Sequence, residues 1–278
     1  MSTPAAARQR FAALVGGPDA RLDLADAALL IAAEAYPGLD LDQYRRALDG
    51  LAGGAAPGVR AAGSDVERVR ALITYLAGEH RFSGNQADYY DRRNSLLNEV
   101  LDRRTGIPIT LALVYIEVAR RLDLPVVGVG FPGHFLAKYA GQTDVVFDPF
   151  FGRVLSEPDC AARLRAALGA DAPFDRRYLR AATPREILVR ILRNLKQIHL
   201  QAREFAAALA CSDRILLVEP ELAAELRDRG LLWQQLDCVS AARADLERFL
   251  ALAPHDDSAA GVRERLIALR RHTGSTVH

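Results

Sequence analysis

The segment Ile107–Leu122 constrains the fold more than any other part of this chain, because nearly all of its residues are apolar. The apolar residues cover almost every face of the predicted helix: Leu111, Ala112, Leu113, Val114, Tyr115, Ile116, Val118 and Ala119. A helix that is apolar all round is normally buried on most sides. Pro108 suits the first turn of such a helix, where a missing N–H is no loss. The sequence therefore predicts a buried central helix.

Three short runs of β-branched and aromatic residues follow this helix and predict strands. The runs are Val126–Phe131, Phe135–Tyr139 and Val145–Phe147. We expect them to form a small antiparallel sheet packed on the central helix, which makes the core an α+β structure.

Helices are predicted for most of the remaining chain. The segments are 8–55 with Leu24–Ala35 and Asp42–Leu51, Ser64 to about Ala77, Asp91–Arg103, Glu157–Leu168 and Pro184–Leu200. Ser64 and Glu67 have the spacing of a capping box at the start of a helix. Glycine, alanine and proline at 53–58 predict a loop.

A repeat of 34 residues marks the last third of the chain. Pro220 and Pro254 stand 34 positions apart, and Ala208 and Ala242 have the same offset. This period is typical of tetratricopeptide helix pairs, which form grooves for peptides or partner helices. About two repeats and a final helix, Ser258–Arg270, are too few for a free-standing array. We therefore expect these helices to dock on the core.

Bulk composition excludes several classes of protein. The net charge is +1, which gives no electrostatic reason to bind nucleic acid or an anionic membrane. Cys160, Cys211 and Cys238 form no CxxC pair, so neither a disulfide framework nor a zinc site is expected. Neither a signal peptide nor a transmembrane run is visible. The sequence predicts a cytoplasmic protein without metal or other cofactor.

His134 and Asp148 stand near the ends of two predicted strands. A histidine oriented by an aspartate suits general-base chemistry. The alternatives are a ligand-binding group, a metal ligand or a purely structural hydrogen bond. No further metal ligands are evident in the sequence.

Polar residues before the central helix are further candidates. Asn94, Asn98 and Glu99 precede it, and a side-chain amide there is able to bind a carbonyl oxygen in a cleft. Capping or bracing of a loop is the commoner role of asparagine.

The run RRTGIPITLALVYIEVARRLDLPVVGVGFPGHFLAKY, followed by FDPF, resembles the bacterial SirB family over roughly residues 60–270. Members join a transglutaminase-like core to C-terminal tetratricopeptide repeats. In active transglutaminase-like enzymes a cysteine opens the buried helix, and a histidine and an aspartate on later strands complete the triad. The resemblance matches His134 and Asp148 to the last two. Counting back from Leu122-Asp123-Leu124-Pro125, it places the cysteine position near Pro108.

The missing cysteine bears directly on function. A helix N-terminus lowers the pKa of a thiol, whereas a proline there supplies neither a nucleophile nor an N–H. Thr110 carries a hydroxyl in the first turn of the predicted helix. It is either an activated nucleophile or a first-turn hydroxyl bonded to backbone. The three cysteines lie on other predicted helices and suit small buried hydrophobes.

These observations predict a mostly helical α+β protein with a papain-like, cysteine-hydrolase type of core. Residues 1–60 form an N-terminal helical segment, 61–180 the transglutaminase-like core and 181–278 the repeat helices. The favoured function is a non-catalytic module that binds a protein or peptide through its core cleft and repeats. The alternative is an amide or peptide hydrolase, or a transglutaminase-type enzyme, that uses His134 and Asp148 without a cysteine.

Overall fold

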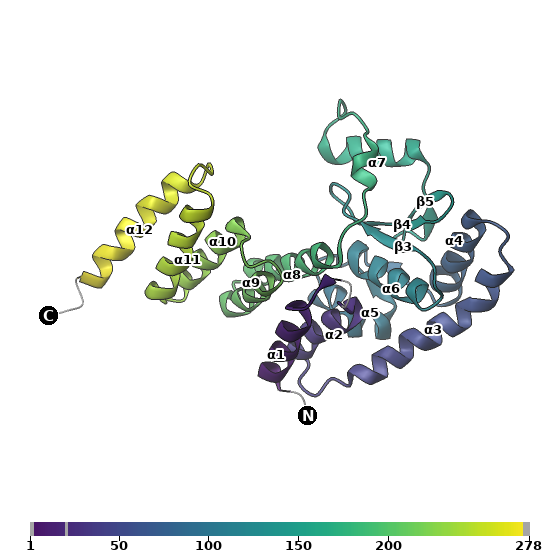
Figure 1. Cartoon of the computed structure of the whole chain (residues 1–278), viewed down its shortest axis with the longest axis horizontal. Coiled ribbons are helices and arrows are strands. Elements are labelled where there is room, and N and C mark those ends of the chain that lie inside the picture. Colours follow the sequence, from purple (N-terminus) through teal and green to yellow (C-terminus); the bar gives the residue numbers. More distant parts are fainter. Residues whose placement is uncertain (1–2, 20–21, 275–278) are drawn as a thin grey trace. The chain divides into compact units, whose positions relative to one another are not determined.

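The computed structural model describes residues 3–19 and 22–274 (Figure 1). It divides into two compact units, Met1–Ile191 and Leu192–His278, with the boundary inside helix α8 (Pro184–Gln201). The mostly helical α+β class is confirmed. The docking of the repeat helices on the core stays a prediction.

The first unit begins with three helices, α1 (Pro4–Val15), α2 (Leu24–Ala35) and α3 (Leu41–Ala61). Side-chain oxygens of Thr3, Asp23 and Asp40 accept hydrogen bonds from backbone N–H groups in the first turns. α2 is buried over most of its length between its neighbours, as its alanine and leucine content predicts.

The predicted loop at 53–58 is wrong, because α3 continues through it to Ala61. The apolar residues Ala52, Ala55, Ala56 and Val59 are buried, and this packing overrides the low helix propensity of glycine and proline. Gly54 lies close to a side chain of the next helical segment: a Cβ there would lie 1.9 Å from the Tyr75 hydroxyl, so a larger residue would displace the end of that side chain. A Cβ on Gly53 would meet nothing within 4 Å and one on Gly58 would make an ordinary contact, so only Gly54 has a close neighbour, and none of the three glycines marks a turn.

The next helix begins at the predicted cap. α4 (Asp65–Ile73) starts after Ser64, whose hydroxyl accepts from the Glu67 N–H while the Glu67 carboxylate accepts from Gly63. Its last turn is a π-helix, η2 (Thr74–Glu79), so the helical segment ends two residues beyond the predicted Ala77.

The single helix predicted for Asp91–Arg103 is also wrong. A 3-10 helix, η3 (Arg92–Ser95), is separated from α5 (Leu97–Arg103) by the extended residue Leu96. The Asn94 carbonyl accepts from the Thr110 hydroxyl at 2.7 Å and from the Ile107 N–H at 3.4 Å. It is therefore engaged by the start of the central helix and does not support a continuous helix.

The central helix is α6 (Pro108–Arg120), which is buried nearly all round as predicted. It contacts α2, α3 and the sheet strands β3 (Val126–Val129) and β4 (Leu136–Ala140). The sheet continues with β5 (Asp144–Asp148) and β6 (Arg153–Val154) in the antiparallel order β3-β4-β5-β6. The predicted antiparallel sheet is confirmed, with β6 as an addition.

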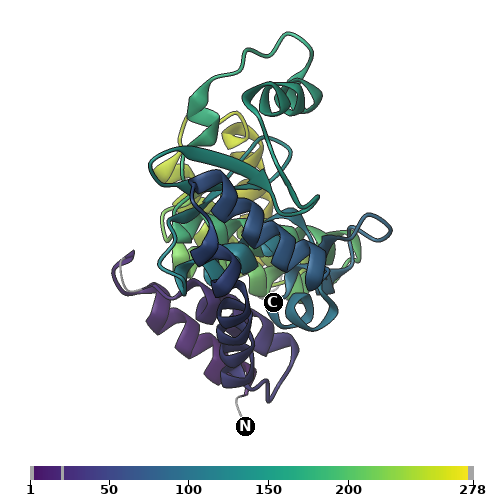
Figure 2. The same ribbon diagram turned by 90° about the vertical axis from the view of Figure 1, so that its right-hand side faces the viewer.

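Three further elements complete this unit. A short parallel pair, β1 (Ser83–Gly84) and β2 (Thr105–Gly106), lies just before α6. α7 (Glu157–Leu168) is followed by the 3-10 helix η4 (Arg176–Leu179). α7 and α6 lie on opposite sides of the sheet (Figures 1 and 2). On the α7 side, the core contains Val129, Leu136, Val146, Cys160 and Leu164.

The second unit consists of the end of α8 followed by α9 (Phe205–Val218), α10 (Ala223–Gln235), α11 (Val239–Leu252) and α12 (Ala259–Gly274). From α9 onwards, each helix contacts the next along the chain, which is the packing that the 34-residue period predicts. α10 and α11 approach closely at Gly230, where a Cβ would lie 2.8 Å from the Leu246 side chain. Across the described ranges, none of the helices is long and apolar enough to cross a membrane.

Candidate functional site

His134 and Asp148 meet at one end of the sheet, where β4 begins and β5 ends. His134 follows a turn in which Gly133 has φ of 67° and the His134 N–H donates to the Phe131 carbonyl. Asp148 is the last residue of β5 and is fully buried. His134 Nε2 lies 3.1 Å from both carboxylate oxygens, Oδ1 and Oδ2. The strand ends thus place the two predicted residues in direct contact.

The carboxylate of Asp148 has a full set of partners. Arg163 Nη2 on α7 donates to Oδ2 at 2.8 Å, and the Phe150 N–H donates to Oδ1 at 3.0 Å. A buried carboxylate needs such partners, because its desolvation is otherwise costly. Sequence reasoning missed Arg163, since only tertiary packing brings α7 to the sheet.

Two phenylalanines frame the imidazole. The ring of Phe151 stacks with His134 at 6.3 Å and 14°, and Phe150 meets it edge-on at 5.9 Å. Arg163 also lies over the Phe151 ring, 5.6 Å from its centre. The imidazole is therefore fixed on two sides, and its side chain keeps 11% exposure.

The second ring nitrogen of His134, Nδ1, has no hydrogen-bond partner in the described part of the chain. When Nε2 donates to Asp148, neutral histidine carries its lone pair on Nδ1. An imidazole in that state is able to accept a proton from a nucleophile. The pair therefore retains the geometry of a base and its orienting carboxylate.

The helix start offers no nucleophile to that base. Pro108 is the first residue of α6. Thr110 is 1% exposed, and its hydroxyl donates to the backbone carbonyls of Asn94 at 2.7 Å or Ile107 at 3.1 Å. The same oxygen accepts from the Ile107 N–H. The hydroxyl thus forms part of the helix cap, which is the structural alternative considered from the sequence.

Asn94 braces a loop. Its amide donates to the carbonyls of Asp88 at 2.7 Å and Tyr89 at 3.3 Å, and its side-chain oxygen accepts from Asn85. The Tyr89 ring in turn packs on Phe150, 6.3 Å away. Asn94 therefore supports the aromatic frame of His134 from behind and is fully buried.

Asn98 and Glu99 face the N-terminal helices. Asn98 hydrogen-bonds to Tyr44 on α3, and Glu99 to Tyr36 at the end of α2. Burial and a hydrogen bond to Asp102 raise the pKa of Tyr44 to about 12. No hydrogen bond joins Asn98 or Glu99 to His134 or Asp148 among the described residues, so their role in a cleft stays a prediction.

The cysteines do not replace the missing thiol in the observed geometry. Cys160 lies on α7 in the apolar cluster beside the sheet, and burial raises the pKa of its thiol to about 11. It is therefore protonated at neutral pH and a poor nucleophile. Cys211 is buried and Cys238 exposed, both in the second unit.

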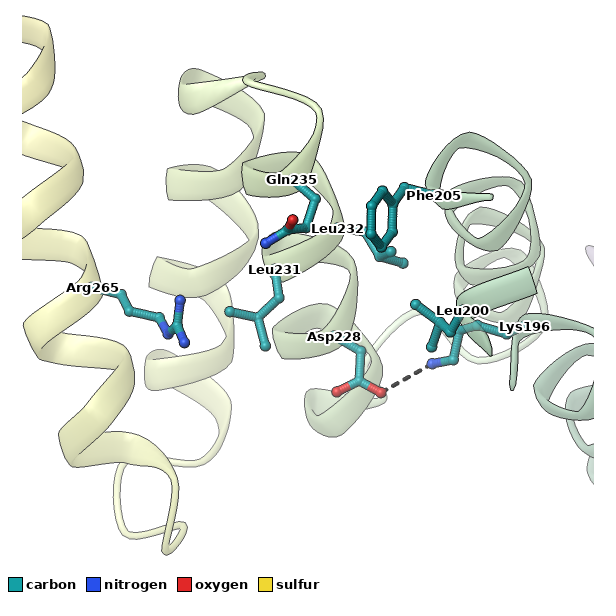
Figure 3. Close-up of a pocket in the computed structure, with 8 residues that line it drawn as sticks. All are labelled: Lys196, Leu200, Phe205, Asp228, Leu231, Leu232, Gln235 and Arg265. Carbon is teal, nitrogen blue, oxygen red and sulfur yellow. Dashed lines mark hydrogen bonds and ion pairs between the residues drawn. The ribbon is translucent and has the colours of Figure 1, made fainter. Parts of the chain in front are cut away.

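The second unit contains a pocket of about 320 Å³ (Figure 3). Its lining comes from α8, the start of α9, α10 and α12: Lys196, Leu200, Phe205, Asp228, Leu231, Leu232, Gln235 and Arg265. Lys196 is buried and pairs with Glu225 at 2.7 Å and Asp228 at 3.0 Å. Arg265, exposed on α12, donates to the amide oxygen of Gln234 at 3.3 Å. The pocket thus combines an apolar wall with one accessible cation.

Family models match both units. A model described as transglutaminase-like superfamily covers residues 42–193, and one described as tetratricopeptide repeat covers residues 195–267. The first begins within the segment predicted as N-terminal helices.

Several relatives match this chain over most of its length. A UPF0162 protein of Xylella fastidiosa (strain 9a5c) is 42% identical over 263 residues, which is 90% of this chain and 91% of the relative. The UPF0162 protein PA3419 of Pseudomonas aeruginosa is 40% identical, over 92% of this chain and 94% of its own. The protein SirB1 of Salmonella typhimurium is 29% identical, with 73% and 76% covered. The chain therefore belongs to the transglutaminase-like family that includes the UPF0162 proteins and SirB1.

Proposed function

We propose that this chain is a non-catalytic, cytoplasmic binding protein. Its repeat unit holds a segment of a partner protein, and its core keeps a base without a nucleophile. The observation that supports this most strongly is the start of α6, where Pro108 is the first residue and stands near the position at which the family resemblance places the cysteine. Proline has neither a thiol nor an N–H with which to stabilise an oxyanion.

The neighbouring groups support the same conclusion. The Thr110 hydroxyl is engaged by backbone groups, and breaking those bonds would leave buried polar atoms without partners. The Cys160 thiol is buried and protonated. Covalent catalysis needs an activated nucleophile within hydrogen-bond reach of its base, and these residues do not supply one.

The pocket in the second unit supports a binding role. Tetratricopeptide repeats generally bind peptides or helices of other proteins. Leu200, Phe205, Leu231 and Leu232 offer an apolar surface of the kind that anchors a partner side chain. The ion pairs of Lys196 fix the polar part of the pocket before a partner arrives.

A hydrolase or transglutaminase-type activity is the second candidate. It is favoured by the contact of His134 Nε2 with both oxygens of Asp148 and by the uncommitted Nδ1 in the described residues. Such an enzyme would use His134 to activate water or the Thr110 hydroxyl. The second route requires the helix cap at Thr110 to open first.

A capture experiment tests the binding role. Wild type, Leu231→Glu and Leu217→Glu are each immobilised and exposed to a bacterial lysate, and bound proteins are quantified by mass spectrometry. Leu231 lines the pocket, whereas Leu217 is an exposed leucine of α9 outside it. We expect a defined set of proteins to bind wild type and Leu217→Glu and to be lost from Leu231→Glu. Equal binding to all three would refute a role for the pocket.

A further inference from the structure

Arg190 on α8 carries a charge that has no acidic partner in the part of the chain that the structure describes. Its Nη2 donates to the His134 carbonyl at 2.7 Å, and its guanidinium lies over the Phe135 ring, 5.4 Å from the centre. The residue is half-buried, and this burial lowers the pKa of its side chain. Within residues 3–19 and 22–274, no carboxylate lies at ion-pair distance from it.

Two other half-buried arginines of this chain pair with carboxylates. Arg163 pairs with Asp148 at 2.8 Å, and Arg229 pairs with Asp245 at 2.7 Å and Asp213 at 3.0 Å. Removing a guanidinium from water without a counter-charge is costly. It has five N–H donors in a planar fork, and the structure accounts for one of those of Arg190. Its remaining donors are suited to a carboxylate from outside the chain.

An aromatic surface lies next to this cation. Tyr89, Tyr90 and Phe151 are 43%, 61% and 47% exposed and are among the few large hydrophobic residues that face solvent. Their rings are linked through contacts of 5.4 Å between Tyr89 and Tyr90 and 4.9 Å between Phe150 and Phe151. Arg190 is linked to this surface through His134, whose carbonyl accepts from Arg190 at 2.7 Å and whose ring stacks with Phe151 at 6.3 Å. Grouped exposed aromatic side chains typically mark a binding surface.

We propose that this surface binds an extended acidic peptide segment. The carboxylate of an acidic side chain pairs with Arg190, and adjacent apolar side chains lie on Tyr89 and Phe151. A small free anion would satisfy the guanidinium but would leave the aromatic rings exposed, so a peptide fits both features. This site lies in the first unit and is independent of the pocket proposed for the repeat helices.

Isothermal titration calorimetry with two end-blocked peptides tests this assignment. The probes are acetyl-Ala-Phe-Glu-Phe-Ala-amide and the same peptide with glutamine in place of glutamate. They are titrated into the full chain as wild type, Arg190→Gln, Arg190→Lys, Phe151→Ala and Arg265→Gln. The last is a matched control, because it removes the accessible cation of the repeat pocket by the same substitution.

Wild type is expected to bind the glutamate peptide about tenfold more tightly than the glutamine peptide, as a charge-assisted pair predicts. Arg190→Gln should bind both equally, and Arg265→Gln should keep the preference. Phe151→Ala should weaken both peptides to a similar extent.

Three results would overturn the proposal: no preference in wild type, a preference that survives Arg190→Gln, or one that is lost in Arg265→Gln. The last result would move the acidic ligand to the repeat pocket and leave the proposed function intact. If thermal unfolding shows that Arg190→Gln is not folded, the peptide preference of Arg190→Lys tests the proposal instead. A lysine lacks the planar fork, so its preference should shrink, and an unchanged preference would count against the site.

Discussion

Asp148 holds the core site together, because its buried carboxylate accepts hydrogen bonds from His134, Arg163 and the Phe150 backbone. We predict that Asp148→Ala lowers the free energy of unfolding by about 2–4 kcal/mol, since it leaves the Arg163 charge without its partner. Denaturant unfolding measures this. Asp144→Ala removes a carboxylate that is 61% exposed and should cost under about 1 kcal/mol. Equal losses in the two variants would contradict the role given to Asp148.

Asp65 makes stability depend on pH. Its carboxylate accepts from the Thr143 N–H at 2.9 Å and from Arg68 at 2.8 Å, and these bonds lower the pKa of Asp65. Stabilisation from a lowered pKa is present above the unfolded value of about 3.9 and is lost as pH falls through the folded value. Asp65→Asn should therefore have a lower melting temperature than wild type at neutral pH. This difference in melting temperature should disappear as the pH falls below about 4. A gap that does not change with pH would show that the charge is unimportant.

The thiols should differ in reactivity. Cys238 is exposed, whereas burial raises the pKa of Cys160 to about 11. Iodoacetamide at about pH 8 should label Cys238 in the folded protein and Cys160 only after denaturation. Peptide mapping locates the adducts. Rapid labelling of Cys160 in the folded protein would instead restore it as a candidate nucleophile.

Residues close to a strand end were predictable, and their partners from other elements were not. His134 and Asp148 follow from strand patterns and from the family resemblance. Arg163 and Arg190 come from helices that touch the sheet only in the folded chain. Sequence spacing carries no information on such contacts. The sequence also showed where the polar residues before α6 stand in the chain, but not which neighbours their side chains contact.

At the scale of elements, small residues matter where helices approach closely. A Cβ on Gly230 of α10 would lie 2.8 Å from the buried Leu246 and 3.3 Å from the Ala242 carbonyl. Gly230→Ala should therefore destabilise the second unit by about 1–3 kcal/mol, although alanine is the better helix former. Trp233, the only tryptophan, reports unfolding of this unit.

A matched substitution controls for helix propensity. A Cβ added to Gly261 of α12 would meet no described neighbour within 4 Å, so Gly261→Ala should raise stability by about 0.5–1 kcal/mol. A stabilised Gly230→Ala would mean that α10 and α11 have room to move apart.

Long periodic elements were predicted well, whereas short or irregular ones were not. The all-apolar pattern of α6 predicts a buried helix, and the 34-residue period predicts repeated helix pairs. The prediction of a loop at 53–58 was wrong because glycine and proline usually break helices. In this chain, burial of the alanines and of Val59 stabilises the helix. The break at Leu96 depends on the Asn94 carbonyl, which a distant residue, Thr110, occupies.

In the whole molecule, the two compact units correspond to the transglutaminase-like domain and the tetratricopeptide repeat domain. The family models meet at residues 193 and 195, close to the boundary at Leu192. Two relatives match 90% and 92% of this chain, so their similarity extends over both units. A net charge near zero fits the proposal that specific sites, and not a general electrostatic field, select partners.

Analysis of reaction products tests whether the core has a base, His134, but no nucleophile. Purified wild type and His134→Ala are incubated with a mixed peptide library and a primary amine, and mass spectrometry scores cleavage, deamidation and amine incorporation. We expect no product that depends on His134, when thermal unfolding shows that both proteins are folded. Products formed by wild type and absent with His134→Ala would contradict it and would identify an enzyme with a rebuilt nucleophile.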